Sequence, residues 1–161
     1  MTNEAVLLDT SFFIRLLNDS DPLCKNADEY FQFFLDKKIQ MMISTISIAE
    51  YCVGGVLSEL PLNNLLILPF NFDHAKRAGE LAKIVFSAKK KGQIDVYNRT
   101  IIPNDTNLFA QADSNVKIKY FLSSDKESLK IYNLLTTEIP LNFQFIHLNN
   151  SYHEYFGYLK F

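Results

Sequence analysis

Short apolar runs alternate along the chain with longer segments in which apolar residues recur every three or four positions. The short runs predict buried strands at residues 5–8, 41–44, 65–68, 118–122 and 143–148. The longer segments predict helices at residues 10–17, 22–38, 47–53, 73–91, 105–112 and 125–135. Short strands that alternate with helices favour an α/β fold, a three-layer α/β/α sandwich with a mainly parallel central sheet.

Two segments fit neither pattern. Residues 92–103 predict an irregular connection, and residues 151–161, rich in Tyr and Phe, resist assignment. No repeat, linker or low-complexity tract divides the 161 residues, a length that suits one domain with a sizeable core. We therefore expect a single domain over residues 1–161, with a C-terminal extension from about residue 141.

Four acidic residues interrupt the apolar pattern, each close to a predicted helix. They are Asp9 after VLL, Glu50 after MMISTISIA, Asp105 after IIPN and Asp125 after YFLSS. In a parallel α/β sheet such positions gather outside the strand ends, where active sites form. Carboxylates brought together there repel one another unless a cation lies between them, and Mg²⁺ or Mn²⁺ prefers such oxygen ligands. The four acids therefore predict an Mg²⁺ or Mn²⁺ site.

Two of these acids also have a structural interpretation as part of a helix start. Ser47-x-x-Glu50 and Ser124-x-x-Glu127 each match a capping box, in which the Glu side chain reaches back to the N-cap amide. Glu50 would then be a cap, and Asp125 a first-turn residue that suits the helix dipole.

The other two acids differ in how well capping explains them. Asp105 follows Pro103 and can be an N-cap or a first-turn acid. Asp9 ends a buried strand and has neighbouring hydroxyl residues that can cap the helix in its place. Only the joint position of the four acids at one sheet edge makes them a site.

Composition narrows the class of protein. No apolar run approaches the roughly 20 residues that span a bilayer, and MTNEAVLLDT has no basic leader region, so we expect a cytoplasmic protein with no membrane segment. Cys24 and Cys52 have no CxxC pattern, so we expect small buried residues in a reducing compartment. The histidines His74, His147 and His153 lie outside the acidic positions, which argues against zinc and Ser-His-Asp chemistry.

The formal net charge of -2 argues against broad binding to duplex nucleic acid, which usually needs a basic face. Local basic residues remain candidates for substrate contacts, namely Arg15, Arg77, Lys89, Lys90 and Lys91. The three lysines also fit a helix C-terminus that ends at Gly92.

The sequence resembles the PIN-domain ribonucleases, in particular the VapC-type toxins of toxin–antitoxin pairs. The segments that carry the resemblance occur in family order over residues 5–135: VLLDTSFFI, ISTISIAEYCVGGV, LPFNFDHAKRAGELA, IIPNDTNLFAQA and FLSSDKES. By position, the four acids match the acidic quartet of that family. Ser11 and Ser123 match hydroxyl residues that support the quartet.

The resemblance implies a metal-dependent endoribonuclease that forms a homodimer and is neutralised by an antitoxin protein. Two alternatives stay open, namely a PIN nuclease of RNA maturation and a module that binds RNA or protein without cutting. Phosphatases of the haloacid-dehalogenase type also place an Asp after their first strand, but they need a second acid two residues later. This chain has Ser11 there, which argues against that class of enzyme. The connection at residues 92–103 is longer than is common among the toxins, and so is the tail after Leu141.

Overall fold

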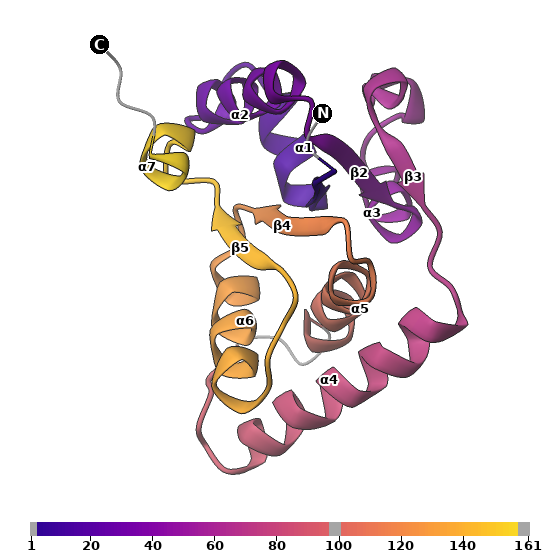
Figure 1. The fold of residues 1–161 in the computed structure, drawn as a ribbon, viewed down its shortest axis with the longest axis vertical. Coiled ribbons are helices and arrows are strands. Elements are labelled where there is room, and N and C mark those ends of the chain that lie inside the picture. The colour runs from indigo at the N-terminus through magenta and orange to yellow at the C-terminus, as the bar shows by residue number, and fades with distance from the viewer. Residues whose placement is uncertain (1–2, 97–100, 158–161) are drawn as a thin grey trace.

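The computed structural model describes residues 3–96 and 101–157. Within them, five strands form one sheet in the order β3-β2-β1-β4-β5, and every neighbouring pair is parallel (Figure 1). The strands are β1 (Ala5–Leu8), β2 (Gln40–Ser44), β3 (Leu66–Leu68), β4 (Ile118–Ser123) and β5 (Gln144–His147). The predicted parallel sheet is therefore confirmed.

Helices cover both faces of this sheet (Figure 1). They are α1 (Thr10–Leu16), α2 (Cys24–Lys37), α3 (Thr45–Tyr51), α4 (Phe72–Lys90), α5 (Ile101–Ser114), α6 (Lys126–Glu138) and α7 (Tyr152–Phe156). Two single turns of 3-10 helix, η1 (Leu57–Glu59) and η2 (Leu62–Asn64), connect α3 to β3. The three-layer α/β/α sandwich is the architecture that the sequence predicts.

The central strand shows how the sequence builds two cores. Successive side chains of a strand point to opposite faces. Val6 and Leu8 thus join the apolar cluster under α1, α2 and α7, whereas Leu7 joins the cluster under α4, α5 and α6. All four residues of β1 are buried, which is why the strand reads as an unbroken apolar run.

The helix starts differ from the predicted capping boxes. Helix α3 begins two residues earlier than expected, with Ser44 as its N-cap and the Ile46 N–H donating to Ser44 Oγ at 3.0 Å. Ser47 and Glu50 therefore lie inside the helix, and the capping interpretation of Glu50 is wrong. At α6 the N-cap is Asp125 itself, not the preceding serine, so that capping box is wrong as well.

Helix α5 also starts before its predicted position. The described part of the chain resumes at residue 101 already in helical conformation, which places Asp105 in the second turn. Asp105 is therefore neither an N-cap nor a first-turn residue. Of the predicted irregular connection, residues 92–96 contain no helix or strand, residues 97–100 lie outside the described residues, and residues 101–103 are helical.

The aromatic tail contains the short helix α7, which the sequence pattern left unassigned. Its Tyr152 and Phe156 rings pack on Phe33 of α2, with ring centroids 5.0 and 4.7 Å apart. The two cysteines are free thiols, but Cys52 is exposed and Cys24 only partly covered, so the expectation of buried cysteines is wrong. Among the described residues, no helix has the length and apolar character required to cross a bilayer.

Candidate active site

Three strand ends bring the predicted acids to one edge of the sheet. The carboxyl ends of β1, β2 and β4 are adjacent because β1 pairs in parallel with both neighbours. Asp9 follows β1 directly, and α3, which carries Glu50, begins immediately after β2. Asp125 lies two residues beyond β4, and Asp105 approaches from α5.

All four acids line one pocket of about 210 Å³. The other residues of this acidic pocket are Thr10, Ser11, Ile14, Asn104 and Leu108. The convergence that the sequence predicts is thus present in the structure. The catalytic and metal-binding roles of the acids stay predictions.

Asp9 is held by two serine hydroxyls. Its Oδ2 accepts hydrogen bonds from Ser11 Oγ at 2.8 Å and from Ser123 Oγ at 2.7 Å. The same hydroxyls accept from the backbone N–H groups of Ser124 and Asp125, at 2.9 and 3.0 Å, so the turn after β4 is fastened to Asp9. Burial raises the pKa of Asp9, and the two serine hydrogen bonds oppose that rise.

Glu50 is held by a hydroxyl from the neighbouring helix. Thr10 Oγ1 donates to Glu50 Oε2 over 2.5 Å. Partial burial raises the pKa of Glu50, the Thr10 hydrogen bond lowers it, and the negative charge of Asp9 raises it again. Because Glu50 makes a bond to the helix after β1, its position is determined by the site and not by the start of α3.

The environment of Asp105 disfavours its ionised form. The residue is only 8% exposed, and its Oδ2 is buried without a hydrogen-bond partner. Burial and the charges of Asp9 and Asp125 raise the pKa of Asp105 to about 8. Among the described residues, no positive charge compensates ionised Asp105, and a bound cation would supply one.

The donor set matches a hard divalent cation in chemistry. The charged groups that line the pocket are four carboxylates, and none of the lining residues is a histidine or a cysteine. Mg²⁺ and Mn²⁺ prefer oxygen ligands of this kind. Within residues 3–96 and 101–157, however, no group of three or more His, Cys, Asp or Glu side chains has an arrangement that could hold a metal ion. Asp9, Glu50 and Asp125 accept hydrogen bonds from hydroxyl and N–H donors, so joint coordination requires these side chains to turn toward one another.

Arg15 is the predicted basic residue that lies next to the acidic pocket. Its Nε donates to Ser124 Oγ at 3.5 Å, beside Asp125, and its Nη1 forms an ion pair of 2.6 Å with Asp21. Its guanidinium is partly exposed at this position. Arg15 is therefore placed where it can contact a substrate at the rim of the pocket.

Neither Arg15 nor any other predicted basic residue is among those that line the pocket, and the other four interact elsewhere or are exposed. Arg77 forms an ion pair with Asp113 at 2.8 Å, which joins α4 to α5, and a second with Glu80 at 3.0 Å within α4. Asp113 lies eight residues after Asp105, about 12 Å along a helix, so Arg77 is held away from the acidic pocket.

The three lysines lie at the end of α4, which Gly92 terminates with φ of 70°. Lys89 donates to the Val96 carbonyl at 3.0 Å, while Lys90 and Lys91 are exposed. For Arg77 and Lys89 these contacts favour structural roles, whereas substrate contact by Lys90 and Lys91 stays a prediction.

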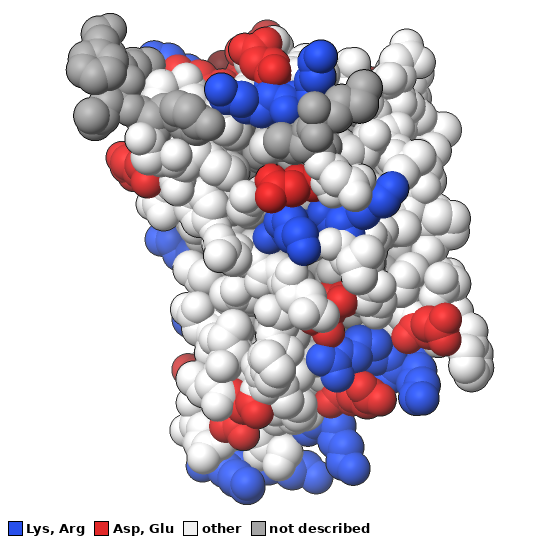
Figure 2. All heavy atoms as spheres, viewed as in Figure 1, with Lys and Arg blue, Asp and Glu red and all other residues white. Residues whose placement is uncertain are grey.

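Charges of both signs are interspersed on the face of the molecule in Figure 2, and the described residues there form no continuous basic surface.

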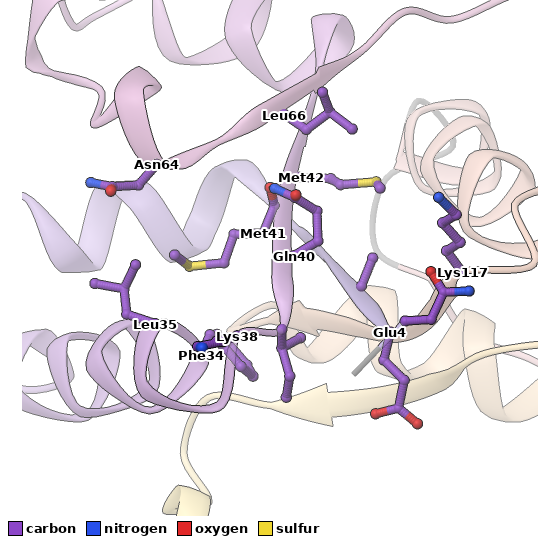
Figure 3. Close-up of a pocket in the computed structure, with 13 residues that line it drawn as sticks. Glu4, Phe34, Leu35, Lys38, Gln40, Met41, Met42, Asn64, Leu66 and Lys117 are labelled. Carbon is purple, nitrogen blue, oxygen red and sulfur yellow. The ribbon is translucent and has the colours of Figure 1, made fainter. Parts of the chain in front are cut away.

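A larger pocket of about 500 Å³ lies at the opposite edge of the sheet, where β1 and β2 begin. Its polar side chains, including Lys38, Gln40 and Lys117, come from separate elements and do not converge on one point (Figure 3). Glu4 is its only acidic residue, so this pocket lacks the character of the acidic pocket.

Sequence reasoning missed hydroxyl and amide residues around the acids. Thr10 follows Asp9 directly and was expected only to cap α1, although a hydroxyl next to a strand-end acid is a signal for such a contact. Asn104 lines the pocket beside Asp105. Among the histidines, His147 pairs in register with Ser123 and is close enough to Asp125 to feel its charge, but it is not part of the pocket lining.

No family model matches the sequence, and no curated protein matches it. Solved structures do match. One is a chain in the crystal structure of VapBC2 from Rickettsia felis bound to a DNA fragment from their promoter. It is 19% identical in sequence, and the match has a TM-score of 0.56 and covers 88% of this chain and 98% of that one. Another is a chain of DNA-bound VapBC from Salmonella typhimurium, with 16% identity, a TM-score of 0.55 and the same coverage, 88% and 98%. The fold is therefore a PIN-like α/β/α sandwich, and it is the fold found in VapBC structures.

Proposed function

We propose that this chain is a metal-dependent endoribonuclease of the VapC type, which hydrolyses RNA phosphodiester bonds with Mg²⁺ or Mn²⁺. The observation that carries the proposal is the convergence of four carboxylates on one pocket, with a buried Asp105 oxygen that accepts no hydrogen bond from the described residues. The PIN-like fold supports the same activity.

The residues divide into two groups by their contacts. Asp9, Asp105 and Asp125 would hold the cation, because they come from three elements that meet at the pocket. When bound, a divalent cation supplies Lewis-acid activation of water and neutralises charge on the phosphate. Thr10 holds Oε2 of Glu50, which leaves the other carboxylate oxygen to accept a proton from the attacking water.

Arg15 would contact the RNA backbone at the rim of the pocket. Its guanidinium is already oriented by Asp21 and Ser124, so little side-chain freedom is lost when a phosphate binds. A single anchored arginine, in place of a wide basic surface, suits a chain with a net charge of -2. Such a protein would select single-stranded or structured RNA by local contacts and not by general attraction to nucleic acid.

The partners we propose are a cognate antitoxin protein and a second copy of the chain. Exposed apolar side chains support a protein partner. Ile14, 51% exposed, lines the acidic pocket, and others lie between α3 and the start of α4: Val53, Val56, Leu57, Leu66, Ile67 and Phe72. The surface over β3 is largely uncharged in Figure 2. Exposed apolar side chains gathered in one segment of the chain favour a protein contact there.

The test is cleavage of a labelled single-stranded RNA by purified protein with Mg²⁺ or Mn²⁺. Wild type should cut, chelation should stop cleavage, and Asp9→Asn should fold normally and be inactive. Asp28→Asn, an exposed acid on α2, is the matched control and should retain activity. Equal cleavage by Asp9→Asn and wild type would overturn the proposal. RNA binding without cleavage would instead favour the non-catalytic module. That alternative stays open because the described residues contain no group already arranged to hold a metal ion.

Growth arrest on expression, relieved by the protein encoded next to this chain, would separate the toxin from a nuclease of RNA maturation. A maturation nuclease should leave growth unchanged and alter the ends of specific cellular RNAs.

A further inference from the structure

The acids of the pocket differ in how the protein satisfies them. Asp9 and Glu50 accept hydrogen bonds from hydroxyl groups, and Asp125 Oδ1 accepts from two backbone N–H groups at the start of α6. Asp105 is the exception, because its Oδ2 is buried and has no donor in the part of the chain that the structure describes. Buried polar atoms are rarely left in this state, so the missing donor calls for an explanation.

A donor of the required kind lies opposite Asp105. Ser128 belongs to the first turn of α6 and is 1% exposed, and its Oγ is buried without a hydrogen bond. Helices α5 and α6 pack together, and the Ser128 hydroxyl is close enough to the Asp105 carboxyl for a side-chain hydrogen bond that lowers the pKa of that carboxyl. A hydroxyl and a carboxylate oxygen are thus neighbours, both buried and both unsatisfied.

The backbone of Ser128 is already engaged at the site. Its N–H donates to Asp125 Oδ1 at 3.4 Å. Its side chain needs only a change of rotamer or of hydroxyl direction to donate to Asp105, since serine has three staggered wells and a freely rotating O–H. One residue would then contact two acids that come from different elements.

We infer that Ser128 is a positioning residue of the acidic pocket, whose hydroxyl bonds to Asp105 and fixes which oxygen of that carboxylate faces a bound cation. This inference rests on the proposed function for the nature of the ligand. Ser128 itself touches neither substrate nor cation. It acts on the site in the same way as Ser11 and Ser123 act on Asp9 and Thr10 acts on Glu50.

The first experiment measures the affinity for Mn²⁺ alone, without RNA. Ser128→Ala should weaken Mn²⁺ binding about tenfold, the lower end of what outer-shell partners of metal ligands contribute. The melting temperature of the metal-free variant should fall slightly, because the variant removes a hydrogen-bond donor from the buried Asp105 carboxyl group. Ser128→Thr, which keeps a hydroxyl, should restore most of the affinity.

Ser47→Ala is the matched control. Ser47 is a fully buried serine on α3 whose Oγ also lacks a hydrogen bond, and it does not line the acidic pocket. Its loss should leave Mn²⁺ affinity at the wild-type value. Wild-type affinity in Ser128→Ala, or a lowered melting temperature with unchanged affinity, would overturn the inference and leave the proposed function intact.

The second experiment needs no cation. The melting temperatures of Ser128→Ala, Asp105→Asn and the double variant form a cycle in the metal-free protein. Shifts that fail to add show that the two side chains interact, and additive shifts contradict the inference even where wild type binds Mn²⁺. Failure of wild type to bind Mn²⁺ would count against the proposed function alone, because the cycle still tests the contact.

Discussion

Thr10 Oγ1 lies 2.5 Å from Glu50 Oε2, and this hydrogen bond joins the helix that follows β1 to the helix that follows β2. The residue before Thr10 is Asp9, which is bonded to the end of β4 through Ser123. Neighbouring residues of one short segment thus orient two acids of the pocket and connect three adjacent strand ends. The acidic pocket is therefore a hydrogen-bonded unit and not merely a set of nearby charges.

Replacing Thr10 by Val should reduce RNA cleavage by about tenfold, the order of effect expected when an outer-shell hydrogen bond is removed. The hydrogen bond lowers the pKa of Glu50, so its loss should move the acidic limb of the pH–rate profile to higher pH. Thr10→Ser keeps the hydroxyl and should retain the wild-type profile. Identical profiles for wild type and the Val variant would show that Glu50 is not oriented by this contact.

The metal-free protein should lose stability as the pH rises from about 4 to about 8. The folded-state pKa of Asp105 is raised from 3.8 to about 8, so folding favours its protonated form. This contribution is complete below about pH 4 and is lost progressively up to about pH 8, at a slope of up to about 1.4 kcal/mol per pH unit. Burial shifts the pKa of Asp9 and of Glu50 in the same direction.

Denaturant unfolding across this pH range would measure the effect. Asp105→Asn removes the titrating group, so the variant should lose much of the pH dependence and be more stable than wild type at pH 8. A wild type that gains stability from pH 5 to pH 8 in a chelator would contradict the direction given for Asp105.

Divalent cations should reverse this trend. Mn²⁺ should raise the melting temperature more at pH 8 than at pH 5, because protons compete with the cation for the carboxylates. At a concentration 100 times its Kd, the cation should add roughly 2.7 kcal/mol to the free energy of unfolding. Thermal melts with and without a chelator would show the shift in wild type and in Asp28→Asn, and not in Asp9→Asn.

Lys38 offers a stability prediction far from the acidic pocket. It ends α2 in the left-handed conformation, with φ of 57° and ψ of 33°, where glycine is favoured. Lys38→Gly should therefore stabilise the protein by about 1 kcal/mol without changing RNA cleavage. Lys37→Gly, one residue earlier and still helical, should destabilise it by about 1 kcal/mol. The two urea midpoints should move in opposite directions, and a common direction would exclude this backbone explanation.

The helix boundaries show why local patterns misjudged two of the acids. Ser47 and Glu50 have the spacing of a capping box, yet Ser44 ends β2 and caps the helix first. A capping box depends only on neighbouring residues, whereas the actual start of α3 is decided by where β2 leaves the sheet. The same competition makes Asp125 the cap of α6 in place of Ser124.

Basic residues were the least predictable part of the candidate site. Arg15 and Arg77 were equal candidates in the sequence. Arg15 lies beside Asp125, whereas Arg77 bonds to Asp113 at the far end of α5. A long flexible side chain gives no indication in sequence of which acid it meets. The exposure of Cys52 is a similar case, because it follows the last turn of a short surface helix.

The sequence by itself determined the order of the strands and of helices α1 to α6, the parallel sheet and the four acids that follow breaks in its apolar pattern. These features depend on local periodicity and on the rule that parallel strands end at a common edge. Only the tertiary structure decided that Thr10 bonds to Glu50 and that Ser128 faces an unsatisfied Asp105. Those contacts join segments that are distant in the chain, and they depend on helix packing and side-chain rotamers that no local pattern encodes.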